Sequence, residues 1–132
     1  MKFVLILIAV LCFTVSYSQD KKPEVKEFKF TDCKSDCKIG VISKKGKGKK
    51  MTLVTGVNAQ CCMKFECDVK MSGDTMIVKS LMFGSPCRCY CNYELSYVIG
   101  NIKCKKIKEI KLEHDWHPDW DTPEERKAKL EK

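Results

Sequence analysis

The chain has 132 residues and a formal net charge of +8, and ten of its residues are cysteines. This length suits a single domain and leaves little chain for a second one. So many cysteines in a short chain indicate a disulfide framework formed in an oxidising compartment, which argues against a cytosolic protein.

A cleaved signal peptide is predicted over residues 1–18. Lys2 precedes an almost unbroken apolar run from Phe3 to Val15, and Ser16-Tyr17-Ser18 has the small-x-small pattern of a signal-peptidase site before Gln19. As a helix, this run of 13 residues reaches only about 20 Å, whereas the hydrocarbon layer of a membrane is about 30 Å thick. We therefore expect a secreted protein, periplasmic or extracellular, with no transmembrane segment after cleavage.

Nine cysteines remain after cleavage, and an odd number cannot pair completely. One thiol is therefore left free, joins two chains as a disulfide-linked dimer, or binds a metal. Each bridge adds on the order of 2 to 4 kcal/mol, mostly by restricting the unfolded chain. All nine are disulfide candidates: Cys33, Cys37, Cys61, Cys62, Cys67, Cys87, Cys89, Cys91 and Cys104.

The first predicted strands are short and have polar connections. Val25 to Phe30 alternates apolar and charged residues, as a half-buried strand does. Ile39 to Ser43 and Met51 to Val57 are β-rich runs on either side of Lys44 to Lys50, which contains two glycines and five lysines. This pattern predicts a hairpin whose loop is kept in solvent by its own charge.

The lysine-rich loop is the candidate anion contact. Its ammonium groups can attract phosphate, sulfated polysaccharide or anionic lipid, although a solvated hairpin tip is the simpler interpretation. Sequence-specific binding to nucleic acid is not expected, because the loop has no aromatic residue and the mature chain has only two arginines. The candidate residues are Lys44, Lys45, Lys47, Lys49 and Lys50.

The clearest alternation of apolar and polar residues lies in Cys61 to Val69, which predicts an antiparallel strand with one solvated face. Thr75 to Met82 follows a tight turn at residues 71–74 and is the expected partner strand. Because neighbouring residues in a strand face opposite ways, Cys61 and Cys62 should find different disulfide partners.

A row of cysteines opens the stretch from Cys87 to Ile99. In a strand, one face would carry Cys87, Cys89, Cys91, Tyr93, Leu95, Tyr97 and Ile99. The continuous apolar face predicts a buried central strand. Cys61 and Cys67, on another inward-facing strand, offer disulfide partners to this row.

The last predicted strand is Ile102 to Leu112, whose spacing also fits a helix, although the β-rich context favours a strand. Six or seven short strands joined by turns of Gly, Asn, Ser and Pro predict an all-β fold over residues 19–112. We expect an antiparallel β-sandwich, immunoglobulin-like or similar, stabilised by disulfides.

Residues 113–132 form an acidic tail that contains Trp116 and Trp120. Within it, Thr122-Pro123-Glu124-Glu125 supplies an N-cap, a proline at the first helical position and a glutamate at the third. The sequence therefore predicts a short C-terminal helix that runs to about Leu130.

Two groups of residues are candidate metal ligands, although we expect no metal. The row of Cys87, Cys89 and Cys91 is suited to a soft ion such as copper or zinc, but the Cys-x2-Cys pairs of structural zinc sites are absent from the sequence. His114 and His117, with the carboxylates of Asp115, Asp119 and Asp121 near them, can hold a divalent ion. Such tail segments are more often solvated surface. Disulfides are the favoured interpretation of the cysteines.

The order Cys-Cys-x-x-Phe at residues 61–65, then Cys-x-Cys-x-Cys-x-Tyr at residues 87–93, precedes an alternating strand and a Gly-Asn turn. Together with the Ser-Tyr-Ser-Gln cleavage region, this order resembles small exported cysteine-rich β-domain proteins of Bacteroidetes-type bacteria, over about residues 59–112. The resemblance implies export and a β fold and assigns no activity or site. Cysteine-rich secreted proteins of animals, including venom-type proteins, are the alternative source.

The sequence favours a secreted, non-enzymatic binding or structural module, with an unknown protein or an anionic polymer as its partner. Catalysis is not expected, because both histidines lie in the tail and no Ser-His-Asp arrangement or glycine-rich phosphate loop can be placed. One alternative is a soft-metal-binding protein that uses the clustered cysteines. The other is a secreted hydrolase or redox enzyme whose site the sequence does not reveal.

Overall fold

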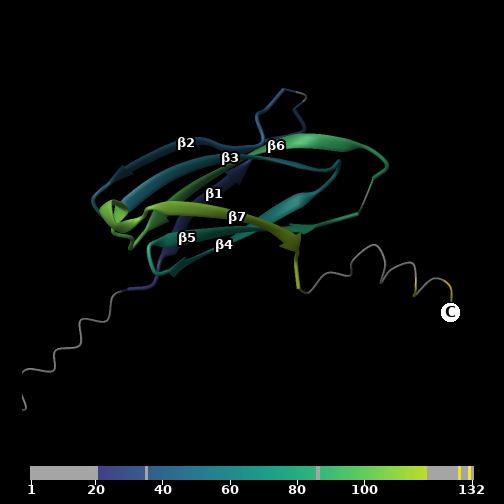
Figure 1. Cartoon of the computed structure of the whole chain (residues 1–132). Coiled ribbons are helices and arrows are strands. Elements are labelled where there is room, and N and C mark those ends of the chain that lie inside the picture. Colours follow the sequence, from purple (N-terminus) through teal and green to yellow (C-terminus); the bar gives the residue numbers. More distant parts are fainter. Residues whose placement is uncertain (1–20, 35, 86, 119–127, 129–130, 132) are drawn as a thin grey trace, which may run out of the picture.

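A computed structural model of the chain describes residues 21–34, 36–85, 87–118, 128 and 131, and this part forms seven β-strands in two sheets (Figure 1). The strands are β1 (Glu24–Phe30), β2 (Gly40–Lys47), β3 (Lys50–Gln60), β4 (Lys64–Ser72), β5 (Thr75–Phe83), β6 (Tyr90–Gly100) and β7 (Glu109–Trp116), with the 3-10 helix η1 (Cys104–Lys106) before β7. The all-β prediction is confirmed. The predicted signal peptide, and the predicted C-terminal helix apart from Ala128, lie outside the described residues.

The first sheet has the strand order β1-β6-β3-β2, with all neighbours antiparallel, so β6 is central as predicted. Its inward face carries Cys91, Tyr93, Leu95, Tyr97 and Ile99, none more than 5% exposed. The strand begins only at Tyr90, so Cys87 and Cys89, which were predicted within it, precede it.

The second sheet has the order β4-β5-β7 and forms a separate layer from the first (Figure 1). The two sheets share one hydrophobic core. The strand predicted over Cys61 to Val69 begins only at Lys64. Within β4 the predicted alternation is observed, with Phe65 and Val69 buried and Cys67 half-buried between them. The Phe65 ring of β4 meets the Tyr93 ring of β6 edge-on, with 4.9 Å between the ring centroids. Residues from facing sheets thus build the core together, which holds the two layers in place.

β5 and β7 run parallel, so the expectation of a wholly antiparallel arrangement is wrong. The chain leaves β5, enters the first sheet as β6 and returns to the second sheet as β7. The chain reverses its direction each time it crosses from one sheet to the other. After the two crossings, β7 therefore runs in the same direction as β5. The strand order also differs from that of immunoglobulin domains, in which the first, second, fifth and fourth strands form one sheet.

β1 and β2 lie at opposite edges of the first sheet, so the connection between them crosses its outer face, as the dark blue loop above β6 in Figure 1 shows. The connection first follows β6 through an antiparallel bridge between Lys34 and Asn92. It then passes over Gly56 of β3, where a Cβ would lie 1.8 Å from the Lys38 carbonyl oxygen. Only glycine lets the loop pass this close.

The predicted seven-residue lysine loop is wrong, because β2 and β3 pair as far as Lys47 and Lys50. The turn is reduced to Gly48-Lys49, with Gly48 in the left-handed conformation (φ 60°) that a two-residue hairpin turn requires. Lys44, Lys45, Lys47 and Lys50 are therefore strand residues, all exposed.

The predicted domain limit after Leu112 falls inside a strand, because β7 continues to Trp116. The stretch from Ile102 contains η1, and the strand begins only at Glu109. The acidic residues are tolerated in β7 because they meet lysines: Lys111 Nζ lies 3.1 Å from Glu113, and Lys79 Nζ lies 3.2 Å from Asp115.

Candidate functional sites at the two ends of the strands

Three disulfides gather at one end of the strands, which we call the cysteine end. They are Cys33–Cys91, Cys61–Cys89 and Cys62–Cys87, with Cα–Cα distances of 5.3, 5.4 and 6.3 Å. The first joins the β1–β2 connection to the start of β6, and the other two join the β3–β4 turn to the β5–β6 connection. The bonds therefore tie together segments that are 25 to 58 residues apart in sequence.

The strand register explains which cysteines meet. Cys61 N–H donates to the Cys89 carbonyl oxygen at 2.9 Å, which extends the β3–β6 ladder and sets these two residues opposite each other. Cys62 has a left-handed conformation (φ 66°) that turns the chain towards Cys87. The prediction that Cys61 and Cys62 have different partners is confirmed. Cys91 lies opposite the small residue Ala59, which leaves room for its bond to Cys33.

Three of the nine disulfide candidates are unpaired, namely Cys37, Cys67 and Cys104, where the odd count alone required one. Cys67, a predicted partner for the cysteine row, instead lies opposite Ser80 within the second sheet. Cys37 lies against the outer face of the first sheet, and Cys104 lies in η1. Three different locations prevent these thiols from pairing with one another.

Two of the unpaired thiols, those of Cys67 and Cys37, are poorly suited to thiol catalysis. Burial raises the pKa of Cys67 to about 11, and the nearby Asp68 and Glu66 carboxylates add to this rise. Burial also raises the pKa of Cys37, whose Sγ donates to the Tyr93 carbonyl oxygen at 3.5 Å. A thiol with a raised pKa is mostly protonated near neutral pH and is a weak nucleophile.

The predicted metal ligands are not brought together. Cys87, Cys89 and Cys91 each bond to a different cysteine, so the row does not act as one set of thiolates. His114 Nδ1 forms a hydrogen bond with the hydroxyl of the buried Ser80. Burial lowers the pKa of His114. His117 instead contacts β4, where its Nε2 lies 3.0 Å from Oε2 of Glu66. Residues three apart in an extended chain face opposite ways, which separates the two imidazoles.

A different group of sulfur atoms has the spacing of a metal site. The Sγ atoms of Cys33, Cys61 and Cys91 all lie within 4.8 Å of one another. Cys33 was predicted only as a disulfide candidate, because its position beside β6 depends on the Lys34–Asn92 bridge. No local sequence pattern indicates that bridge.

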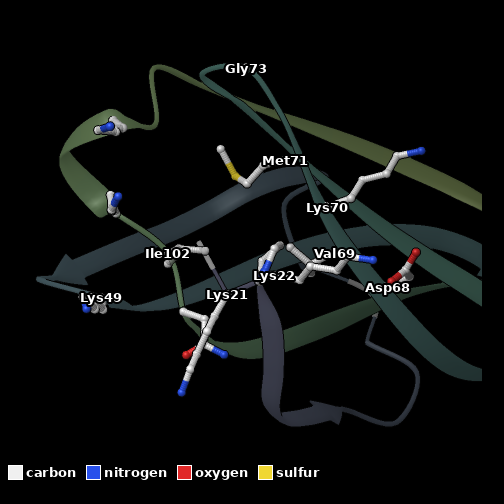
Figure 2. A pocket seen from close by; sticks show the side chains of 13 residues that line it. Lys21, Lys22, Lys49, Asp68, Val69, Lys70, Met71, Gly73 and Ile102 are labelled. Carbon is white, nitrogen blue, oxygen red and sulfur yellow. The ribbon is translucent and has the colours of Figure 1, made fainter. Parts of the chain in front are cut away.

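The opposite end of the strands, the lysine end, contains a cleft of about 890 Å³ (Figure 2). We call it the lysine cleft, because six of the residues that line it are lysines: Lys21, Lys22, Lys49, Lys70, Lys103 and Lys106. Asp68 is the only carboxylate among these lining residues. Val69, Met71 and Ile102 form its apolar part, and Figure 2 shows Met71 and Ile102 directed into the space between β4 and the segment after β6.

The segment at residues 101–108 holds the walls of the lysine cleft in place. Ile102 N–H donates to the Lys49 carbonyl oxygen at 3.3 Å, which attaches this segment to the β2–β3 turn. On the other side, Lys108 N–H donates to the Asp74 carbonyl oxygen at 2.9 Å, and its Nζ lies 3.1 Å from the Asp74 carboxylate. Asn101 reaches the Glu24 carboxylate of β1 at 3.2 Å. Lysines from segments far apart in sequence thereby meet around one cleft.

Only Lys49 of the five predicted anion contacts lines the lysine cleft. Lys44, Lys45, Lys47 and Lys50 lie on the exposed β2–β3 ribbon instead. Sequence reasoning missed the other cleft lysines, because they come from three separate segments. The single available signal was the cluster of basic residues Lys103, Lys105, Lys106 and Lys108.

No protein-family model matches the chain, and no curated protein or solved structure matches it either. Within the part of the chain that the structure describes, no helix is long and apolar enough to cross a membrane.

Proposed function

We propose that this protein is a secreted, disulfide-stabilised β-sandwich that binds an anionic polymer, a sulfated polysaccharide, in the lysine cleft and that has no catalytic role. The observation that carries the proposal is the cleft itself, in which six lysines surround an apolar floor and face a single carboxylate. Like charges repel, so a cluster of this kind lowers stability unless an anion compensates it.

The type of positive charge favours a polymer with many anionic groups. Lysine presents a compact, strongly hydrated charge on a flexible stem, whereas arginine forms the rigid two-pronged contacts that select one phosphate or carboxylate. Among the residues that the structure describes, no arginine lines the cleft. Several adaptable point charges suit repeated sulfate groups along a chain, and their attraction weakens as salt is added.

A polysaccharide is favoured over nucleic acid by the same lining. Proteins that bind single strands combine basic grooves with aromatic side chains on which the bases stack. No aromatic side chain is found among the described residues that line the lysine cleft. The cleft therefore has the positive charge that attracts a polyanion but lacks the aromatic surface on which a nucleic-acid base would stack.

Salt elution from immobilised heparin tests the proposal. A cleft variant carries Lys22→Gln, Lys49→Gln, Lys70→Gln and Lys106→Gln, and a matched control carries Lys44→Gln, Lys45→Gln, Lys47→Gln and Lys50→Gln. Both lose the same net charge, so a difference between them reports position. We expect the wild type and the control to elute at similar salt concentrations and the cleft variant to elute at a clearly lower one.

Two results would contradict the proposal. If the control eluted as early as the cleft variant, retention would reflect net charge alone and the cleft would not be the site. If single-stranded DNA displaced the protein from heparin as well as dextran sulfate does, the choice of a polysaccharide would be wrong.

A further inference from the structure

We infer that Cys33, Cys61 and Cys91, once reduced, form a three-sulfur site for monovalent copper, which is closed when the same cysteines are in disulfides. The site lies at the cysteine end, so it is independent of the lysine cleft and of the function proposed for that cleft. It also differs from the cysteine row predicted as a metal site, because it draws one ligand from each of three separate segments.

The geometry of the sulfur atoms is the first argument. All three Sγ atoms lie within 4.8 Å of one another. Cys61 Sγ lies 2.8 Å from Cys91 Sγ, although these two residues are bonded to different partners. Two disulfides thus already place three potential ligands around one point.

The backbone, and not only the disulfides, holds the three cysteines together. Lys34 N–H donates to the Asn92 carbonyl oxygen at 2.8 Å, and Asn92 N–H donates to the Lys34 carbonyl oxygen at 3.2 Å, which fixes Cys33 beside Cys91. The Cys61–Cys89 backbone hydrogen bond of 2.9 Å extends the β3–β6 ladder and fixes Cys61. None of these hydrogen bonds involves a sulfur atom, so breaking the sulfur–sulfur bonds removes none of them directly.

The surroundings suit a soft ion that enters from one side. Cys91 is buried, Cys61 is half-buried and Cys33 is exposed, so the group opens towards solvent at Cys33. Thiolates are soft ligands that favour monovalent copper, zinc and iron–sulfur clusters. Structural zinc is almost always bound by four ligands. Reduction also frees Cys89, the disulfide partner of Cys61, but Cys89 does not belong to the group whose sulfur atoms all lie within 4.8 Å of one another. The group therefore supplies three ligands, which favours copper.

The redox step that opens the site balances with an external dithiol as reductant. Each of the Cys33–Cys91 and Cys61–Cys89 disulfides accepts two electrons and two protons, and each reduction converts one dithiol to a disulfide. Four thiols result. Copper(I) then replaces the thiol protons of Cys33, Cys61 and Cys91, which are released to solvent.

Copper binding by the reduced protein tests the inference. The protein is reduced without oxygen, freed of reductant and titrated with copper(I) against the chelator bathocuproine disulfonate, with the oxidised protein in parallel. We expect the reduced protein to withhold about one copper ion per chain from the chelator and the oxidised protein to withhold none. Cys61→Ser or Cys91→Ser should weaken binding by roughly tenfold or more.

The matched control removes the three cysteines outside the disulfides, through Cys37→Ser, Cys67→Ser and Cys104→Ser together, and should keep the copper. Loss of copper in this control, or equal binding by the oxidised protein, would overturn the inference. Preferential uptake of zinc in direct competition would overturn the choice of metal.

A footprint on the wild-type chain gives a result even if a variant fails to fold. Copper should slow the alkylation of Cys33, Cys61 and Cys91 by iodoacetamide, measured by mass spectrometry, and leave Cys37 and Cys104 unchanged. Equal labelling of the three with and without copper would show that they are not the ligands.

Discussion

The cysteine end and the lysine end close the same two sheets by different means. At the cysteine end, three disulfides join the connections covalently. At the lysine end, the connections are held by backbone hydrogen bonds, among them those of Ile102 and Lys108, and by the Lys108–Asp74 ion pair. Covalent bonds at one end supply stability that offsets the repulsion among the like charges gathered at the other end.

The largest expected effect comes from removing a disulfide at the cysteine end. The Cys33→Ala, Cys91→Ala double variant opens a loop of 58 residues and should lower the free energy of unfolding by about 4 kcal/mol. Urea unfolding followed by circular dichroism measures this loss. Cys104→Ala, which breaks no disulfide, is the control. An equal loss in both variants would mean that the covalent bond does not stabilise this end.

A smaller loss is expected at Gly56, where the connection that carries Cys33 and Cys37 passes over the first sheet. Gly56→Ala places a methyl group 1.8 Å from the Lys38 carbonyl oxygen, so the connection must move, at a cost of roughly 1 to 3 kcal/mol. Gly73→Ala is unsuitable as a control, because Gly73 has a positive φ and a side chain there would itself be strained. Thr52→Ala, at an exposed site of the same strand, is the better control and should have little effect in the same urea assay.

The smallest effect is expected at the lysine end, and it has the opposite sign. Lys22→Gln with Lys106→Gln relieves repulsion in the cleft and should raise the free energy of unfolding by less than about 1 kcal/mol. The gain should shrink as salt is added, because exposed charges are screened. Thermal unfolding at low and high salt measures it. A loss of stability at low salt would show that these lysines make favourable contacts instead.

The alternation of apolar and polar residues was the pattern from which strands could be predicted. The inward residues of β6 and β4 and the separate partners of Cys61 and Cys62 follow from the side-chain period of a strand, which is a local property. The central position of β6 follows from its continuous apolar face. These features need no knowledge of the rest of the chain.

What could not be predicted depends on contacts between distant segments. Cys33 meets Cys91 because of a bridge between Lys34 and Asn92, which are 58 residues apart in sequence. The lysine cleft likewise forms only after residues 101–108 attach to two turns. The end of β7 was not predicted as a strand, because its acidic residues are typical of solvated surface. One of the lysines that compensates them, Lys79, lies on another strand, where it meets Asp115.

β2 also has a consequence for the protein in concentrated solution. It is an edge strand of the first sheet, so one side of it presents backbone groups that another chain could pair with. Val41 and Ile42 are exposed near its start, and Lys44, Lys45 and Lys47 follow them. Lysines on an edge oppose the approach of a second, identical edge. The charges of this strand therefore oppose aggregation through its edge.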